Sequence, residues 1–256
     1  MKRRIALFVG VALLAWLSGL AAQLPAARAI TWFAPEGVTA AGVSGTLWQG
    51  RAARIDTGGP AAVTGAVWDL SAWQLLRGRL AADTRFRFAG LEGSGYLASG
   101  PGGRIAVDGL SLRGPAAGLG DLLPRLPVEP AGQLLVRVEA ATLADGRIER
   151  LAGRMQWSEA ALSAPFDLDL GTVRARIEPT GNGGGYAIEL DGEGGALEIG
   201  GVANLQPAGE YRVDLRLTPT ASAPDGLRET LGLAAQREGD GFRVRRTGRL
   251  TLPEGG

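Results

Sequence analysis

Hydrophobic and polar residues alternate over most of the chain, beginning after residue 33. In the segment 80–88, apolar or small side chains fall on one side of an extended chain, and Asp83, Arg85 and Arg87 fall on the other. The same period of two recurs in residues 134–139, 166–170, 173–178 and 211–217. Strict alternation predicts β-strands with one buried face and one wet face. Strands of this kind are typical of antiparallel sheets.

Glycine-containing dipeptides separate these segments, as expected for the tight turns of β-hairpins. They are Asp108-Gly109, Asp145-Gly146, Asn182-Gly183, Asp191-Gly192 and Asp240-Gly241. Three short segments carry helix signals, namely residues 71–77, 119–123 and 225–232. The pattern therefore predicts a mainly β domain: a long, curled and mostly antiparallel sheet with a few short helices.

A stretch containing Pro124, Pro127 and Pro130 predicts a connection between two parts of this domain. Strands that end on tryptophan occur on both sides of it, at residues 65–68 and 153–157. We therefore predict two similar halves, residues 40–123 and 131–252. Internal duplication is one explanation of the likeness, and coincidence in a chain with 41 glycines is the other.

The first residues follow a different pattern, because Lys2, Arg3 and Arg4 precede an uncharged run at residues 5–24. Twenty residues in a helix span about 30 Å, the thickness of the hydrocarbon core of a bilayer. Basic residues before such a run keep the N-terminus in the cytoplasm. The expected layout is a cytoplasmic N-terminus (residues 1–4), a transmembrane anchor (residues 5–24) and a periplasmic β-rich domain (residues 25–256).

A cleaved signal peptide is the alternative interpretation of the same run. Signal peptides have a shorter apolar region of roughly 7–15 residues, followed by a small-x-small cleavage site. Ala27-Arg28-Ala29 offers such a site, whereas the length of the run favours an uncleaved anchor. Trp32 and Phe33 lie where interfacial aromatic residues flank a membrane span.

The amino-acid composition excludes several common kinds of catalytic and metal site. The chain contains neither cysteine nor histidine, and Lys2 is its only lysine. The chain therefore lacks the cysteine and histidine ligands that zinc, iron and copper sites usually need. It also lacks the histidine of Ser-His-Asp catalysis and has no lysine after Lys2 for Schiff-base chemistry. We predict that the protein is not an enzyme and binds no cofactor and no metal.

The net charge of +1 comes from the N-terminal segment. Without Lys2, Arg3, Arg4 and Arg28, the chain has 23 basic residues against 26 acidic ones. A weakly acidic domain with mixed charges is not expected to bind nucleic acid.

Two groups of charged residues have both a functional and a structural interpretation. Asp167 and Asp169 form the best carboxylate pair for hydrolysis or metal binding, but their alternation with Leu168 favours two solvent-facing positions of one strand. Arginines at positions 243, 245, 246 and 249 suggest a patch for anionic lipids. Their alternation with apolar residues favours the wet face of an ordinary strand.

Tryptophans are numerous in this chain, and four of them follow or end predicted strands. They are Trp48, Trp68, Trp73 and Trp157. We expect them to pack in the core near the ends of strands. A groove for an apolar ligand is the functional alternative.

The segment Val43-Ser-Gly-Thr-Leu-Trp-Gln-Gly-Arg-Ala52 resembles the signature of the N component of the type II secretion system. The family motif corresponds here to Gly45, Thr46, Leu47, Trp48 and Gly50. The basic start, the single hydrophobic run and the tryptophan-rich stretch at residues 67–76 agree with the family. So do the C-terminal segments 227–232, 240–242 and 248–250, and the resemblance covers essentially the whole chain.

The resemblance implies a single-pass protein of the bacterial inner membrane with most of its chain in the periplasm. Such a protein is an accessory, structural component of the machine that exports folded proteins across the outer membrane. Its expected partners are the inner membrane, the inner-membrane platform and other periplasmic parts of the machine, and the family supplies no catalytic residues. A distant likeness to AsmA-like envelope proteins implies an alternative function, in which the apolar sheet face binds or handles lipid.

Overall fold

The computed structural model describes residues 23–33, 37–59, 61–122, 129–163, 167–181 and 184–250. Fifteen strands in these residues form one sheet, in which the strand order follows the chain almost throughout. Every pair of neighbouring strands is antiparallel. The predicted mainly β, antiparallel domain is confirmed.

The strands before the proline-rich connection are β1 (Thr39–Ala41), β2 (Ser44–Gly45), β3 (Gln49–Asp56), β4 (Val63–Leu70), β5 (Leu80–Phe88), β6 (Leu91–Ser99) and β7 (Ile105–Pro115). Those after it are β8 (Pro130–Ala144), β9 (Arg147–Leu162), β10 (Leu168–Thr180), β11 (Gly185–Glu193), β12 (Leu197–Leu205), β13 (Glu210–Pro219), β14 (Gln236–Glu238) and β15 (Gly241–Arg249). The helices of the described residues are α2 (Ala26–Phe33), α3 (Ala72–Leu76), α4 (Gly118–Leu122), α5 (Leu227–Ala234) and the 3-10 turn η1 (Pro101–Gly103).

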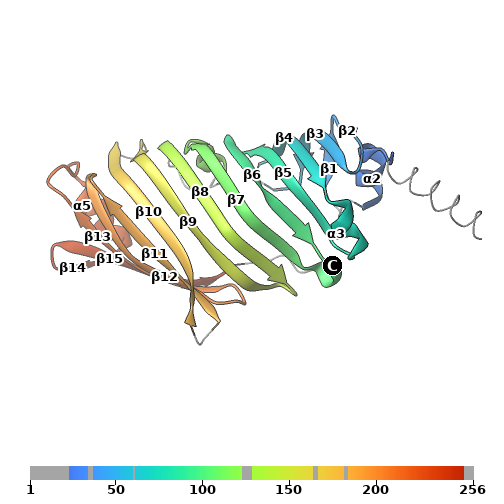
Figure 1. The fold of residues 1–256 in the computed structure, drawn as a ribbon. Coiled ribbons are helices and arrows are strands. Elements are labelled where there is room, and N and C mark those ends of the chain that lie inside the picture. Colours follow the sequence, from blue (N-terminus) through green and yellow to red (C-terminus); the bar gives the residue numbers. More distant parts are fainter. Residues whose placement is uncertain are drawn as a thin grey trace, which may run out of the picture.

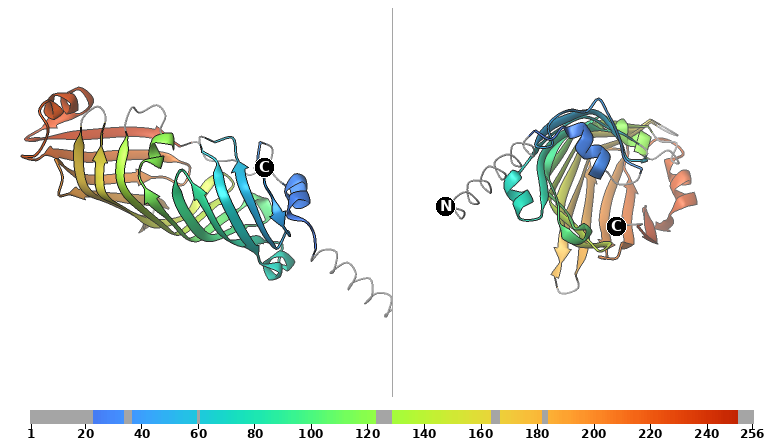
Figure 2. Two further views of the ribbon diagram at one scale, coloured as in Figure 1. Left: turned by 90° about the horizontal axis from the view of Figure 1, so that it is seen from above. Right: turned by 90° about the vertical axis from the view of Figure 1, so that its right-hand side faces the viewer.

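The sheet is long and open. Figure 1 shows the strands side by side, from β1–β3 at one end to β13–β15 at the other. The end-on view in Figure 2 shows that the sheet curves into an arc, and its first and last strands do not pair. The sheet thus has two separate edges. Residues 40–123 and 131–252 both belong to it, because β7 pairs directly with β8 across the proline-rich connection.

The two faces of the sheet match the alternation of the sequence. In β10, Arg174, Arg176 and Glu178 are exposed, while Val173 is buried and Ile177 is half-buried. β5 and β13 show the same pattern, with exposed arginines on one face and half-buried apolar side chains on the other. We call these the polar face and the apolar face.

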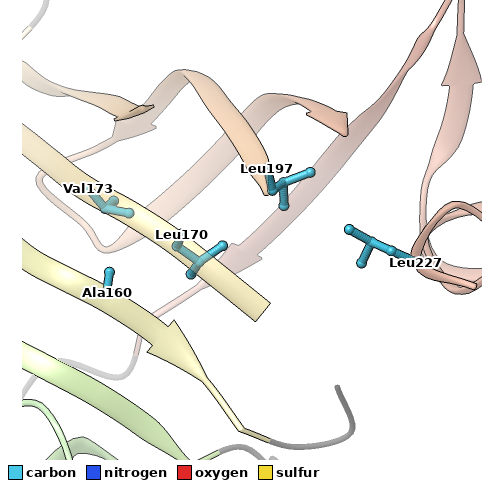
Figure 3. Close-up of a cluster of buried hydrophobic side chains, with 5 residues drawn as sticks. All are labelled: Ala160, Leu170, Val173, Leu197 and Leu227. Atoms are coloured by element: carbon cyan, nitrogen blue, oxygen red, sulfur yellow. The ribbon is translucent and has the colours of Figure 1, made fainter. Parts of the chain in front are cut away.

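Few large side chains are completely buried on the apolar face. About half of the buried apolar residues are alanines, and no large side chain of the described residues falls below 2% exposure. The main cluster lies where α5 covers the sheet, and Figure 3 shows its members: Ala160, Leu170, Val173, Leu197 and Leu227. Elsewhere, apolar side chains such as Phe86, Val136 and Leu215 stay half-buried.

Two predictions about large apolar side chains were wrong. Trp73 is 61% exposed, and the guanidinium of Arg77 lies 4.9 Å from the centre of its ring. It belongs to α3, a five-residue helix at the connection between β4 and β5. Leu80 is also exposed, whereas its neighbour Ala81 is buried, because β5 begins at the rim of the sheet. The other three tryptophans of the core prediction are half-buried rather than buried.

The short helices lie close to their predicted positions. α5 begins at Leu227 and continues two residues beyond Gly232, where the prediction ended. Ser71, the first residue of the predicted segment 71–77, immediately precedes α3, and its side chain makes no capping hydrogen bond. The helix α2 was not predicted; it contains Trp32 and Phe33.

The predicted anchor lies almost entirely outside the described residues, which begin at Gln23. Lys2, Arg3 and Arg4 lie outside them as well. Among the helices that the structure does describe, none has the length and hydropathy required to cross a bilayer.

Candidate functional site

The family motif forms a tight connection between β2 and β3, at the N-terminal end of the sheet. Gly45 ends β2, Gln49 begins β3, and Thr46 lies in the turn between them. The amide of Thr46 donates to the carbonyl of Gln49 at 2.9 Å, and the amide of Gln49 donates to Oγ1 of Thr46 at 3.1 Å. A threonine hydroxyl that accepts a local backbone amide stabilises a turn of this kind.

Both glycines of the motif occupy places that exclude a side chain. Gly45 has a φ of +91°, a left-handed conformation that favours glycine. A Cβ at Gly45 would lie 3.0 Å from the Cα of Gly50 and still closer to the carbonyl oxygen of Gln49. A Cβ at Gly50 would collide with the indole ring of Trp68 and lie 2.9 Å from the carbonyl oxygen of Thr46.

The middle of the motif joins three segments of the chain. The amide of Leu47 donates to the carbonyl of Leu24 at 2.8 Å, and its own carbonyl accepts the indole N–H of Trp68 at 3.0 Å. The carbonyl of Trp48 accepts the amide of Leu70 at 2.6 Å. Pro25 forms an isolated antiparallel bridge with Thr46. The motif thus attaches Leu24, the last residue of the predicted anchor, and the following Pro25 to β3 and β4.

Of the two aspartates singled out by sequence, Asp169 makes a hydrogen bond with the backbone. Oδ1 of Asp169 accepts the amide of Gly171 at 2.8 Å, at an irregularity in the pairing of β9 and β10. Asp167 and Asp169 are both exposed. Within the described residues, no group of three or more acidic side chains has a geometry that could hold a metal ion. The structural interpretation of this pair therefore accounts for its geometry.

An ion-pair network that the sequence did not reveal lies on the polar face near the C-terminal edge. Arg243 donates to both carboxylate oxygens of Asp214, at 2.6 and 2.8 Å, and to Glu238 at 3.1 Å. Arg245 also donates to Asp214, at 3.4 Å. The pairing of β13 with β15 places Asp214 directly opposite Arg245. The network could therefore be recognised only once this register is known.

The network affects the ionisation of its central carboxylate. Hydrogen bonds from Arg243, reinforced by its charge and by Arg245, lower the pKa of Asp214 to about 2. The same contacts raise the pKa of Arg243 above its ordinary value. Charged, bidentate hydrogen bonds of this kind are stronger than neutral ones. The arginines of β15 that face Asp214 are therefore engaged within the chain.

We expect acid to weaken the fold through Asp214. Because its pKa is lower in the folded chain than the ordinary value of 3.8, the ionised carboxylate stabilises the fold above about pH 4. That contribution is lost as the pH falls toward 2. Asp214→Asn should therefore lower the urea midpoint of unfolding near neutral pH and flatten its decline in acid.

The exposed Asp167 provides the control, because it makes no ion pair within the described residues. Asp167→Asn should leave both the midpoint and its pH dependence unchanged. Equal pH profiles for Asp214→Asn and the wild type would rule out this role of the network.

Comparisons with known proteins agree with the motif and the fold. Residues 36–245 match the family model described as type II secretion system (T2SS), protein N. The type II secretion system protein N of Vibrio cholerae serotype O1 is 32% identical over 233 residues, which cover 88% of this chain and 90% of the relative. The protein of the same name from Aeromonas hydrophila is 30% identical over 98% of this chain and all of the relative.

A third relative, the type II secretion system protein N of Klebsiella pneumoniae, is 30% identical over 71% of each chain. No solved structure gave a significant match. The family model covers both the motif and the strands from β1 to most of β15. The chain therefore belongs to the type II secretion system protein N family.

Proposed function

We propose that the protein is an accessory, structural component of the type II secretion system in the inner membrane. In this proposal residues 5–24 cross the membrane once, residues 25–256 lie in the periplasm, and the sheet supports the export of folded proteins across the outer membrane. The partners are the inner-membrane platform and other periplasmic components. Family membership carries the assignment to the system.

The hydrogen bonds of the motif support the structural part of this proposal. Leu47 bonds to Leu24, the last residue of the proposed anchor, and Trp68 bonds to Leu47. A sheet attached in this way is held close to the end of the hydrophobic run. The motif then links the anchor to the domain and needs no catalytic role, consistent with a chain that lacks histidine and cysteine.

Complementation of secretion tests the proposed role. In a bacterium deleted for its own protein N, the wild-type chain should restore export of a folded substrate to the medium. A chain whose residues 5–24 are replaced by a cleavable signal peptide should restore export poorly, although its domain reaches the periplasm. Full export by the signal-peptide version would show that secretion does not need an anchor. The anchor itself is tested by N-terminal sequencing of the wild-type protein in the membrane fraction: a mature chain that starts near Ile30 would refute it.

Lipid binding by the apolar face is a second candidate function. The observation that favours it is that several large apolar side chains of the sheet, such as Phe86, Val136 and Leu215, are only half-buried. In addition, no large side chain of the described residues is less than 2% exposed. A face that is only half covered retains apolar surface that acyl chains can cover. The cluster around Leu227 closes this face only where α5 lies.

Photo-crosslinking at neighbouring positions of β8 separates the two candidate functions. Val136 lies on the apolar face and is half-buried, whereas Arg137 lies on the polar face and is exposed. A benzophenone amino acid at position 136 should capture membrane lipid in intact cells, and the same amino acid at position 137 should not. Equal capture at both positions, or none at either, would count against lipid binding and leave the secretion role unaffected.

A further inference from the structure

The C-terminal edge of the sheet is only partly covered. β15 pairs with β13 from Phe242 to Arg249, which is all of the strand except Gly241. On its other side, β14 pairs only with the first three residues of β15, Gly241–Arg243. The six residues Val244–Arg249 therefore have no strand on their outer side within the described part of the chain. We call them the open edge; Figure 1 shows β15 beside the short strand β14 at the end of the sheet.

The direction of the backbone groups along the open edge follows from one hydrogen bond. The amide of Leu250 donates to the carbonyl of Gly209 at 2.8 Å and so continues the pairing of β15 with β13. In an antiparallel pair, residues that bond to the partner alternate with residues whose N–H and C=O point away. Arg245, Thr247 and Arg249 therefore present their backbone donors and acceptors outward, to the side without a strand.

The open edge is basic although the chain as a whole is nearly neutral. β13, β14 and β15 contain seven arginines against three carboxylates, and β15 alone contains four arginines and no acid. The side chains of Arg245 and Arg249 each have a carboxylate partner yet remain 58% and 66% exposed. Arg246 is exposed on the apolar face and makes no ion pair within the described residues.

We propose that the open edge binds an extended, acidic segment of a partner protein, which adds to the sheet as a further β-strand. The outward N–H and C=O groups of Arg245, Thr247 and Arg249 would pair with the backbone of the added strand. Its acidic side chains would lie beside Arg245 and Arg249 on one face and beside Arg246 on the other. Opposite charges on neighbouring strands stabilise the pairing.

The charges also argue against a second copy of this chain as the occupant. Two copies that paired through this edge would place the arginines of one β15 beside those of the other. Like charges on directly opposed strands destabilise a sheet. An edge rich in arginine is thus protected against its own copy and open to a segment of opposite charge.

A blocked eight-residue peptide of alternating glutamate and valine is the probe for the full-length protein in detergent. Hydrogen exchange, followed residue by residue, should show protection of the amides of Arg245, Thr247 and Arg249 when the peptide is added. The amides of Val244 and Arg246 already face β13, so their exchange should change little. A peptide with lysine in place of glutamate should bind at least about tenfold more weakly, equivalent to about 1.4 kcal/mol.

Position 247 provides the matched pair of variants. Thr247→Pro removes an outward amide that the pairing with β13 does not use, as edge strands tolerate, and should weaken peptide binding by about tenfold or more. Thr247→Val keeps the amide and should bind as the wild type does.

Three results of the peptide experiments would overturn the proposal. They are the absence of protection at the three outward amides of the wild type with about 1 mM peptide, equal binding of the acidic and basic peptides, and equal binding of the two variants. Protection of the same amides without peptide, accompanied by self-association in sedimentation, would assign the edge to a second copy instead. The measurement on the wild type decides the question even if the proline variant does not fold.

Discussion

Replacing Gly50 with alanine is expected to destabilise the protein strongly, although the change adds only one methyl group. The new Cβ would collide with the indole ring of Trp68 and lie 2.9 Å from the carbonyl oxygen of Thr46. Neither neighbour can move freely, because the indole N–H is bonded to Leu47 and Thr46 is bonded to Gln49. Overpacking of this kind costs about 3 kcal/mol, and we expect a loss of that size in the free energy of unfolding.

Gly200 provides the matched control for this prediction. It also lies within a strand, β12, but a Cβ added there would meet nothing within 4 Å. Gly200→Ala should therefore be neutral or slightly stabilising, because alanine restricts the unfolded chain more than glycine does. Urea unfolding of both variants, followed by tryptophan fluorescence, makes the comparison. Similar stabilities for the two variants would show that the motif glycine is not required by packing.

Gly50→Ala also has an expected consequence for the proposed function. Displacement of Trp68 would disturb the hydrogen bond to Leu47 and with it the attachment of Leu24. We expect weaker export of a folded substrate by Gly50→Ala than by Gly200→Ala, at equal amounts of protein in the membrane fraction. Equal export by the two variants would show that the stability of the motif does not determine the role of the protein in secretion.

Replacing Leu227 with alanine is expected to give the second large effect. Leu227 is 4% exposed and packs in the cluster with Ala160, Leu170, Val173 and Leu197 (Figure 3). This cluster is where α5 covers the apolar face, so a shortened side chain leaves a cavity that the sheet cannot easily close. Large-to-small substitutions in such places cost about 2–5 kcal/mol. We expect Leu227→Ala to lower the free energy of unfolding by about 3 kcal/mol.

Leu233 lies on the same helix and provides the control. It is 88% exposed, and therefore Leu233→Ala should change the free energy of unfolding by no more than about 0.5 kcal/mol. Hydrogen exchange should also become faster in α5 of Leu227→Ala and stay unchanged in Leu233→Ala. Equal losses in the two variants would indicate that the propensity of the helix, rather than the cluster, determines this stability.

Much of the sheet can be predicted from sequence because each strand carries its own signal. The alternation in β5, β10 and β13 identifies both their extended conformation and the face that is half-buried. Strands that are neighbours in the chain are almost always neighbours in the sheet. Of the predicted turns, Asp145-Gly146 connects β8 to β9, whereas Asp108-Gly109 and Asp191-Gly192 lie inside β7 and β11, so these two turn predictions were wrong. A sheet with this simple order needs little information beyond local pattern and turn chemistry.

Features that depend on contacts between distant segments could not be predicted in this way. Trp73 was expected in the core because it lies near the end of a predicted strand, but it belongs to a five-residue helix between two strands and is exposed. The network around Asp214 depends on the pairing of β13 with β15 across the intervening helix α5. The family resemblance identified the motif, whereas the reason for its two glycines emerged only from the positions of Gln49 and Trp68.

The attachment of Leu24 to the motif has a consequence for how far the protein can extend. Because Leu24 bonds to Leu47, the sheet starts where the hydrophobic run ends, without a slack linker between them. From β3 to β15 the sheet order contains eleven steps, and neighbouring strands lie about 4.8 Å apart, so the open edge lies roughly 50 Å farther along the curve. For a chain anchored as proposed, the sheet would act as a curved spacer whose span depends on its number of strands. Inserting or deleting a pair of strands would then change the distance to a bound partner by about 10 Å while leaving both ends intact.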